Sequence, residues 1–289
     1  GRTGHGESMP YPRYGESVEQ VIAQLEALRP SIEFGLQRAD LPQHLPAGSA
    51  RNALDCALWD LEAKSQNQPT YKLAELRRPQ PVKTAYTISL DTAENMGRAA
   101  AANAERPLLK IKLAGQGDLE RVEAIRQGAP DAALIVDANE GWERRQVEPF
   151  AEALAQRGVV LVEQPLPVGK DYALSDMAHP LPFCADESCH TAADLPSLAG
   201  RYEYVNIKLD KTGGLTEAIA LLRQARELDM GIMIGCMVAT SLSMAPAALL
   251  ASEADFVDLD GPLLLENDRQ PSLRYEGSTL YPPTPDLWG

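Results

Sequence analysis

The central part of the chain, between Leu108 and Gly214, repeats a short apolar, β-branched segment that ends in charged residues. Five of these charges follow one another at intervals of 25, 26, 23 and 22 residues: Lys112, Asp137, Glu163, Asp186 and Lys208. A buried strand, a loop, a helix and a second loop together take about that many residues. The even spacing therefore predicts that each charge lies at the same point of successive strand–helix units.

Parallel strands joined by right-handed crossovers bring such points together at one end of a sheet or barrel. Eight segments have the pattern of strands: residues 82–90, 108–113, 134–140, 159–165, 181–188, 204–209, 231–237 and 256–262. With helical segments between them, they predict an α/β fold, a (β/α)7β modified TIM barrel. The alternative is an open doubly wound sheet, which usually carries a Gly-rich phosphate loop, and no GxGxxG motif occurs here.

The first 80 residues are poor in strand signals and contain two strong helical patterns. The first, SVEQVIAQLEAL, is expected to be capped by Ser17 and ended by Pro30. The second, SARNALDCALWDLEAKS, is expected to be capped by Ser49 and to place Trp59 in the core. We therefore divide the chain into a small first domain over 1–80, a barrel over 81–270 and a tail over 271–289 that returns to the first domain.

Composition limits the possible partners and the location. The net charge of −14 argues against nucleic acid or an anionic membrane surface as a partner. No apolar run reaches membrane-spanning length, and no secretory signal opens the chain. The four cysteines lack any zinc-binding spacing, so we expect free thiols in a reducing cytoplasm.

Three carboxylates brought to one place repel one another unless they are protonated or share a cation. Oxygen ligands without His or Cys suit a hard divalent ion, so Asp137, Glu163 and Asp186 predict a site for one Mg²⁺ per subunit. A lysine close to other cations loses proton affinity and can act as a base, which makes Lys112 and Lys208 candidate catalytic residues. The alternative is that each charge is a solvated strand end, and the common register of all five argues against it.

The second and sixth strands of a barrel lie on opposite sides of its bore. A substrate α-carbon between Lys112 and Lys208 could lose a proton on one face and gain one on the other, which is racemisation or epimerisation. A lyase with one base would need only one of the two lysines. A lysine base beside Mg²⁺ that stabilises an ene-diolate is also the arrangement of the enolase superfamily.

The motifs resemble those of the muconate-lactonizing subgroup of the enolase superfamily, and most closely its dipeptide epimerases. The K-x-K motif is at Lys110-Ile-Lys112, and the eighth strand carries Asp258-Leu-Asp260. The remaining motifs are VDANE, VEQPLP, ADES and NIKLDKTGG, supported by PYPRYGES, LPAGSARNALDCALWDLEAK and HPLPFCADESCHT. The resemblance covers nearly the whole chain.

This resemblance implies a small α+β capping domain, built from the N-terminal region and the C-terminal tail, above the barrel. It implies Mg²⁺-dependent epimerisation of a dipeptide, such as L-Ala-D-Glu to L-Ala-L-Glu in murein peptide breakdown, and a possible homo-oligomer. Asp258 and Asp260 would hold the ammonium group of the dipeptide. Thr87, Lys110 and Cys236 would contact the substrate, although Thr87 could be an ordinary strand residue and Cys236 a small core residue.

Other activities of the subgroup stay open: N-acylamino acid racemase, o-succinylbenzoate synthase and cycloisomerase. Their substrates have no free ammonium group, so they have no evident need for two acids at the eighth strand. A catalytically silent barrel that serves as a binding or scaffold protein would lack a base or a ligand, and none is missing. The resemblance also implies a strand hairpin before Gly1 whose loop helps to select the substrate side chain.

Overall fold

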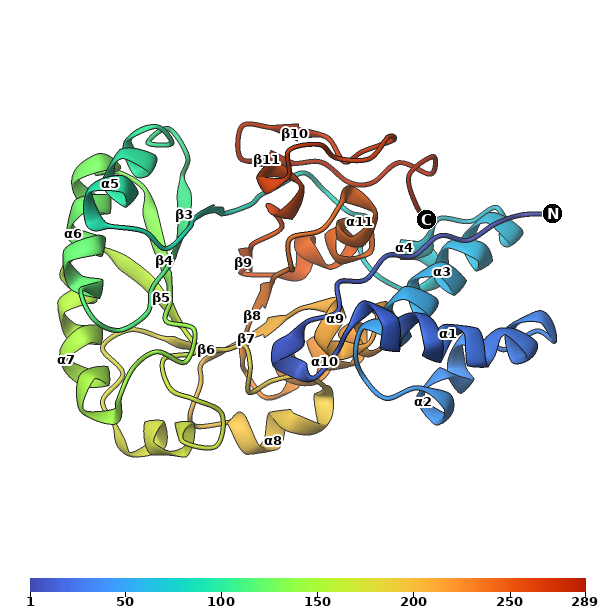
Figure 1. Ribbon diagram of the computed structural model, residues 1–289, viewed down its shortest axis with the longest axis horizontal. Helices are drawn as coiled ribbons and strands as arrows, with labels where there is room; N and C mark the ends of the chain where they lie inside the picture. The colour runs from blue at the N-terminus through green and yellow to red at the C-terminus, as the bar shows by residue number, and fades with distance from the viewer.

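The computed structural model describes all residues 1–289 and contains an eight-stranded parallel sheet in the order β2 to β9 (Figure 1). An N–H···O bond of 2.8 Å from Ala85 to the carbonyl of Val257 joins the first edge of this sheet to the last. This finding confirms the predicted α/β barrel class. The strands are β2 (Tyr86–Ile88), β3 (Leu108–Lys112), β4 (Ala133–Asp137), β5 (Val159–Glu163), β6 (Phe183–Ala185), β7 (Tyr204–Ile207), β8 (Gly231–Ile234) and β9 (Phe256–Val257).

The two faces of the sheet bury different sets of side chains because successive residues of a strand point in opposite directions. In β4, Leu134 and Val136 belong to the large core of 58 residues, whereas Ile135 belongs to a separate small cluster. The members of this small cluster come from four different strands of the sheet: Ile135, Leu161, Cys184 and Met233. We identify it as the filling of the barrel interior, because β-barrel side chains alternate between interior and exterior.

Helical segments connect the strands and cover the outside of the sheet (Figure 1). The α-helices are α5 (Ala93–Ala101), α6 (Asp118–Gly128), α7 (Arg144–Ala155), α8 (Leu195–Leu198), α9 (Leu209–Thr212), α10 (Leu215–Glu227) and α11 (Ser241–Leu250). The connection between β5 and β6 contains only a 3₁₀-helix, η3 (Asp171–Asp176). Short 3₁₀-helices also occur elsewhere: η1 (Pro12–Tyr14), η2 (Arg38–Asp40), η4 (Ala192–Asp194), η5 (Ala251–Glu253) and η6 (Gly261–Leu264).

The prediction of one strand over 82–90 is wrong. The segment forms β1 (Val82–Lys83), which leaves the barrel, and then β2, which belongs to it. β1 pairs antiparallel with β11 (Thr279–Leu280), which also pairs with β10 (Tyr275–Glu276). The alternating apolar pattern is compatible with one long strand. The segment is divided because its first part pairs with the C-terminal segment instead of with the barrel.

The N-terminal helices lie beside the barrel, on the right of Figure 1. They are α1 (Val18–Glu33), α2 (Leu41–His44), α3 (Ser49–Gln66) and α4 (Thr70–Leu73). Ser17 caps α1 as predicted, through a reciprocal capping box with Gln20. Pro30 does not end the helix, which continues to Glu33. Proline removes one hydrogen bond of the α-helical ladder, and the chain continues for only three helical residues beyond it.

The prediction that Ser49 caps α3 is also wrong, because the cap position belongs to Gly48. Gly48 has φ of 137°, which disfavours residues with a side chain, and a Cβ there would lie 2.4 Å from Glu16 Oε1. The Glu16 carboxylate accepts hydrogen bonds from the Ser49 N–H and hydroxyl, both at 2.7 Å. A residue 33 positions away therefore caps this helix, and a local sequence pattern could not reveal it.

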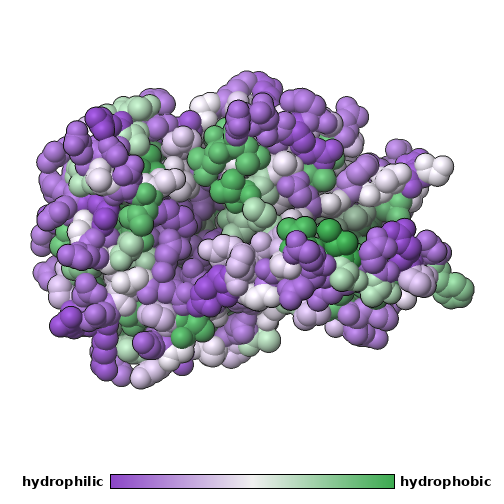
Figure 2. Space-filling view, viewed as in Figure 1, coloured by the Kyte–Doolittle hydropathy of each residue, from purple (hydrophilic) through white to green (hydrophobic).

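The C-terminal end contacts α3 and the first residues of the chain. The Trp288 indole N–H donates to the carbonyl oxygens of His5 and Cys56, each at 3.1 Å, and the Gly289 N–H donates to Asp60. Both termini accordingly lie on the same side of the molecule (Figure 1). Trp59 is buried in the core, as predicted. None of the helices combines the length and the apolar character that a membrane span requires. The face of the molecule seen in Figure 2 is mostly hydrophilic.

Candidate active site

The charged residues predicted to converge do so because of their position along the strands. Asp137 and Glu163 are register partners at the last residues of β4 and β5. Three of the four side chains that fill the barrel interior are followed two residues later by a carboxylate: Ile135 by Asp137, Leu161 by Glu163, Cys184 by Asp186. The period of two along a strand therefore turns these three carboxylates toward the bore at its carboxyl end.

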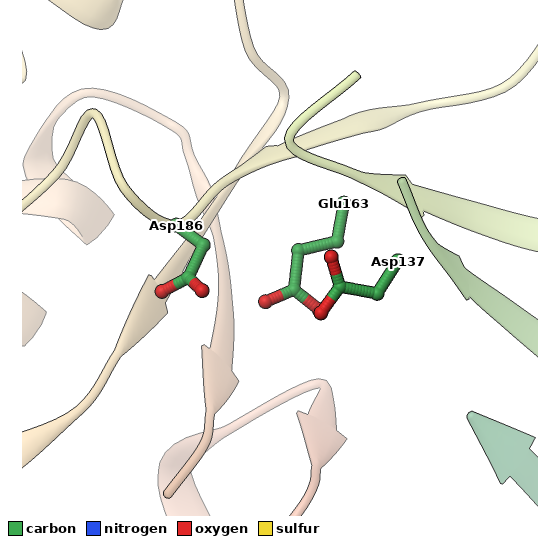
Figure 3. Close-up of side chains that lie close together, drawn as sticks. All are labelled: Asp137, Glu163 and Asp186. Atoms are coloured by element: carbon green, nitrogen blue, oxygen red, sulfur yellow. The ribbon is translucent and has the colours of Figure 1, made fainter. Parts of the chain in front are cut away.

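The three carboxylates form a compact, buried triad (Figure 3). One oxygen of each lies within 4.8 Å of the others, and all three residues are almost completely buried. Glu163 Oε2 and Asp186 Oδ1 have no hydrogen-bond partner of good geometry, although lysine nitrogens lie 2.7 Å from each. Buried oxygens without hydrogen bonds, in an all-oxygen set, are the donors that a hard divalent cation takes. The triad therefore fits a metal ion such as Mg²⁺.

Lysine ammonium groups surround the triad. Lys112 Nζ lies 2.6 Å from Asp137 Oδ2 at one end, and Lys208 Nζ lies 2.7 Å from Asp186 Oδ2 at the other. Lys112 ends β3 and Lys208 follows β7, four strands further round an eight-stranded sheet. The two candidate bases therefore stand on opposite sides of the bore, as the sequence predicts. The side chain of Lys112 is 31% exposed and that of Lys208 only 6%.

Burial and the neighbouring lysines shift the pKa values of the acids in opposite directions. Burial raises the pKa of Asp186, but Lys208 and Lys211 outweigh it and bring that pKa well below its usual range. Burial likewise acts to raise the pKa of Asp137, and Lys112 and Lys110 reverse the effect. For Glu163 burial and Asp137 prevail, and the pKa is raised.

The acids raise the pKa values of two lysines of the site. Burial acts to lower the pKa of Lys110, yet Asp258 and Glu163 raise it well above its usual value. The same balance raises the pKa of Lys208, where Asp186 outweighs burial. Lys110 Nζ lies 2.7 Å from Glu163 Oε2 and 2.8 Å from Asp258 Oδ2, so it joins the triad to the acids that follow β9.

Asp258 and Asp260 follow β9 rather than lying within it, and both line the same cavity as the lysines. Asp258 has Lys110 as a cationic partner, whereas Asp260 has no cation in salt-bridge range. Asp260 accepts a 2.6 Å hydrogen bond from the Thr87 N–H. Burial and the neighbouring Asp258 raise the pKa of Asp260 to about 7. Of the two acids predicted to bind the substrate ammonium group, Asp258 is thus neutralised by a lysine of the protein, and Asp260 is not.

The cavity has a volume of about 290 Å³, and the structure brings most of the predicted site residues to its wall. The predicted residues on the wall are Thr87, Lys110, Lys112, Asp186, Lys208, Cys236, Asp258 and Asp260. Asp137 and Glu163 do not line the cavity, but each contacts a lysine that does, Lys112 and Lys110 respectively. Burial raises the pKa of the Cys236 thiol well above its usual value, so this side chain is a neutral group in the wall.

Several residues of the site have no counterpart in the predictions. Met9, Tyr11 and Tyr14, from the first segment of the chain, line the cavity from the side opposite the barrel. The Tyr14 ring packs edge-on against His190 at 4.7 Å. Lys211 is fully buried and donates to the carbonyl oxygens of three residues while contacting Asp186. The PYPRYGES motif contains Tyr11 and Tyr14, but a motif in the sequence does not show that they reach the cavity.

Family models match almost the whole chain. The model for the mandelate racemase / muconate lactonizing enzyme N-terminal domain matches residues 1–74. The model described as enolase C-terminal domain-like matches residues 91–285.

Two characterised relatives are nearly half identical to this chain. The L-Ala-D/L-Glu epimerase of Escherichia coli (strain K12) is 49% identical over 97% of this chain and 88% of the relative. The N-acetyl-D-glutamate racemase of a Pseudoalteromonas species is 48% identical over 99% of this chain and 91% of the relative.

Solved structures agree with these relatives. An enolase family member from Agrobacterium tumefaciens, with homology to dipeptide epimerases and with bound sodium and L-Ala-L-Glu, superposes with a TM-score of 0.97. It is 51% identical and covers 99% of this chain and 88% of its own. A dipeptide epimerase from Methylococcus capsulatus, complexed with Mg and L-Arg-D-Lys, has a TM-score of 0.87 at 28% identity over 97% of this chain and 85% of its own.

Proposed function

The chain belongs to the mandelate racemase / muconate lactonizing enzyme family of the enolase superfamily, and on this premise we propose that it is a dipeptide epimerase. The reaction is the Mg²⁺-dependent interconversion of L-Ala-D-Glu and L-Ala-L-Glu. The epimerase and the dipeptide-bound structure described above support this choice of substrate.

A single observation carries the proposal: two lysines on opposite sides of the bore flank a buried carboxylate triad. A triad alone fits many metal-dependent reactions, and one lysine would suffice for elimination. Two opposed lysines provide a proton acceptor on one face of a carbon, the lysine that is a neutral amine, and a proton donor on the other, the lysine that is an ammonium. Inversion at that carbon needs both.

Asp137, Glu163 and Asp186 would hold the ion, which when bound would stabilise negative charge on the substrate carboxylate. Lys112 and Lys208 would move the α-proton, each on its own face. Both lysines contact carboxylates of the triad, Lys112 Nζ at 2.6 Å and Lys208 Nζ at 2.7 Å. Lys110, held by Glu163 and Asp258, would supply positive charge beside the substrate carboxylate.

The free amino end of the dipeptide would lie at Asp260. This carboxylate is buried, borders the cavity, accepts a hydrogen bond from the Thr87 N–H and has no cation in salt-bridge range. An ammonium group there would stabilise the charged form, which burial and Asp258 otherwise disfavour. Asp258, already paired with Lys110, would contribute a second, weaker contact.

A second candidate is racemisation of an N-acylamino acid, which has the same metal and lysines. The Pseudoalteromonas racemase, at 48% identity, favours it. The Lys110–Asp258 pair also favours it, because this acid is neutralised without a substrate ammonium group. The unpaired Asp260 favours the dipeptide, since an acylated substrate brings no cation to it.

The proposal extends to the organisation and location of the protein. We place a capping domain at 1–80, the barrel at 81–270 and the tail at 271–289. The antiparallel pairing of β1 with β11 supports a boundary near residue 80. A cytoplasmic location is supported by four cysteines without disulfides.

The test is incubation of the protein with L-Ala-D-Glu and L-Ala-L-Glu in D₂O with Mg²⁺, followed by NMR. We expect the Glu α-proton to be replaced by deuterium as the two epimers interconvert. N-acetyl-Glu of both configurations serves as the competing substrate. Faster turnover of N-acetyl-Glu than of either dipeptide would favour the racemase, and no exchange with any of them would contradict both candidates.

A further inference from the structure

We propose that Gln164 is a positioning residue that fixes the separation of Glu163 and Asp186 and so sets the affinity of the triad for its ion. The inference rests on the proposed function, because it takes these two acids as metal ligands. Gln164 directly follows Glu163, is completely buried and has φ of 35°. This left-handed conformation is unfavourable for a residue with a side chain, and the α region is disfavoured before a proline, here Pro165.

Strained backbone concentrates around the triad. Of the six non-glycine residues with positive φ in the chain, three follow the strands that end in Asp137 and Glu163: Asn139, Glu140 and Gln164. Such conformations persist only where the surrounding structure determines them, and they cluster at functional sites. For Gln164 the surrounding structure is a set of hydrogen bonds that reaches the next strand.

The amide oxygen of Gln164 holds the segment that carries Asp186. Gln164 Oε1 accepts hydrogen bonds from the Asp186 N–H at 2.9 Å and from the Ser188 N–H at 3.2 Å. The Gln164 N–H itself donates to the Cys184 carbonyl at 2.9 Å. Gln164, the residue next to Glu163, is therefore bonded to the backbone two residues before Asp186, at Asp186 itself, and two residues after it.

The amide nitrogen of Gln164 is fixed by a second layer of groups. Gln164 Nε2 donates to the Leu166 carbonyl, the Ser188 hydroxyl and the Tyr202 hydroxyl at 2.8–3.0 Å. Both hydroxyl groups donate their own hydrogen to Asp171 Oδ2, at 2.6 and 3.0 Å. Since each hydroxyl has one hydrogen, both can only accept from Gln164, and this determines which end of the amide faces Asp186. No other side chain of similar size could make all these bonds.

The test replaces Gln164 by Met, which keeps the length of the side chain and removes every amide hydrogen bond. We expect the affinity of the metal-free protein for Mg²⁺, measured by calorimetric titration, to fall roughly 10–100-fold, the usual effect of losing a partner of a metal ligand. Gln156→Met is the matched control, because the Gln156 side chain is exposed and makes no hydrogen bond. Thermal unfolding of each protein without metal identifies variants that are folded at the titration temperature.

Tyr202→Phe removes a single hydroxyl of the second layer and gives a milder variant should Gln164→Met not fold. We expect a smaller loss of Mg²⁺ affinity in the same direction. Parent-like Mg²⁺ affinity in folded Gln164→Met, or in Tyr202→Phe where only that variant folds, would overturn the inference and leave the proposed function intact. Absence of Mg²⁺ binding by the parent protein would instead contradict the proposed function, and the inference with it.

Discussion

The cavity contains two groups of buried acids, the triad and the pair after β9, which differ in the cations around them. Lys112, Lys110, Lys208 and Lys211 all lie within 3.5 Å of triad oxygens. The pair shares only Lys110, through Asp258, and Asp260 has a backbone N–H. Burial is nearly the same in the two groups.

The difference lies in how far lysines of the protein offset the cost of burying each group. Ammonium groups near the triad lower the pKa values of Asp137 and Asp186 despite burial, although that of Glu163 is raised. The pKa of Asp260 rises to about 7 because nothing opposes burial strongly. A buried carboxylate without a cation is costly, and this cost is the basis of our proposal that the substrate ammonium group binds at Asp260.

The largest effect is expected at the triad. Replacing Asp186 by Asn removes one charged ligand, and we expect kcat to fall roughly a thousandfold or more, because metal stabilisation is worth several kcal/mol. Excess chelator should abolish turnover of the parent protein, and added Mg²⁺ should restore it. Glu152→Gln, at an exposed position, is the control. Full activity in chelator would contradict a metal-dependent reaction.

The second effect is the loss of one catalytic face. Lys112→Ala and Lys208→Ala should each lower epimerisation by about 10²–10⁴, the usual contribution of a positioned acid or base. The distinctive result is in D₂O, where each variant should still exchange the α-proton of one epimer only. From the resemblance to the family, we expect Lys112 to take the proton from the R epimer and Lys208 from the S epimer. Lys170→Ala is the control, because Lys170 is exposed and forms no salt bridge. Interconversion of the epimers at the parent rate by Lys112→Ala or Lys208→Ala would refute the two-base scheme.

The third effect tests Asp260, the acid that has no cation of the protein beside it. Asp260→Asn should lower kcat/KM for L-Ala-D-Glu about a hundredfold or more, since removing one partner of a buried pair costs roughly 3–5 kcal/mol. N-acetylation of the dipeptide should cause a similar loss in the parent protein and little further loss in the variant. Equal activity of the parent on free and acetylated dipeptides would assign the protein to the N-acylamino acid racemases.

The smallest effect is on stability without substrate. A folded-state pKa of about 7, above the usual value for Asp, means that Asp260 favours folding when protonated. Its contribution is complete below about pH 4 and is lost as the pH rises to about 7. Between pH 5 and 8 the metal-free parent should lose about 2–3 kcal/mol more of unfolding free energy than Asp260→Asn, measured by denaturant titration. Asp131→Asn, at an exposed position, should behave like the parent, and identical pH profiles of the parent and Asp260→Asn would contradict the assignment.

Much of the triad could be predicted from spacing alone. The even intervals between Lys112, Asp137, Glu163, Asp186 and Lys208 determine which strand end each charge occupies. For the three acids, the period of two along each strand determines that they face the bore, because the residues two positions earlier fill the barrel interior. These are local rules, and a parallel barrel repeats them for every strand.

Predictions that depended on distant partners were less successful. Serine is a residue type typical of helix caps, but at Ser49 the helix begins with Gly48 at the cap position, and Glu16 from another segment accepts the hydrogen bond of its first N–H. The 82–90 segment has the pattern of one strand, but its first part pairs with β11 at the other end of the chain. In both cases the deciding contact is made by a residue that no local window contains.

The sequence by itself therefore determined the register of the charges, the barrel class and the identity of the acids and lysines at its mouth. Only the tertiary structure decided how those charges are partnered: that Lys110 neutralises Asp258, that Asp260 stays without a cation, and that Gln164 is held in a left-handed conformation between two acids. The physical reason is that repeating local geometry places a side chain on a face, whereas charge balance and hydrogen bonding depend on distances between strands far apart in the chain.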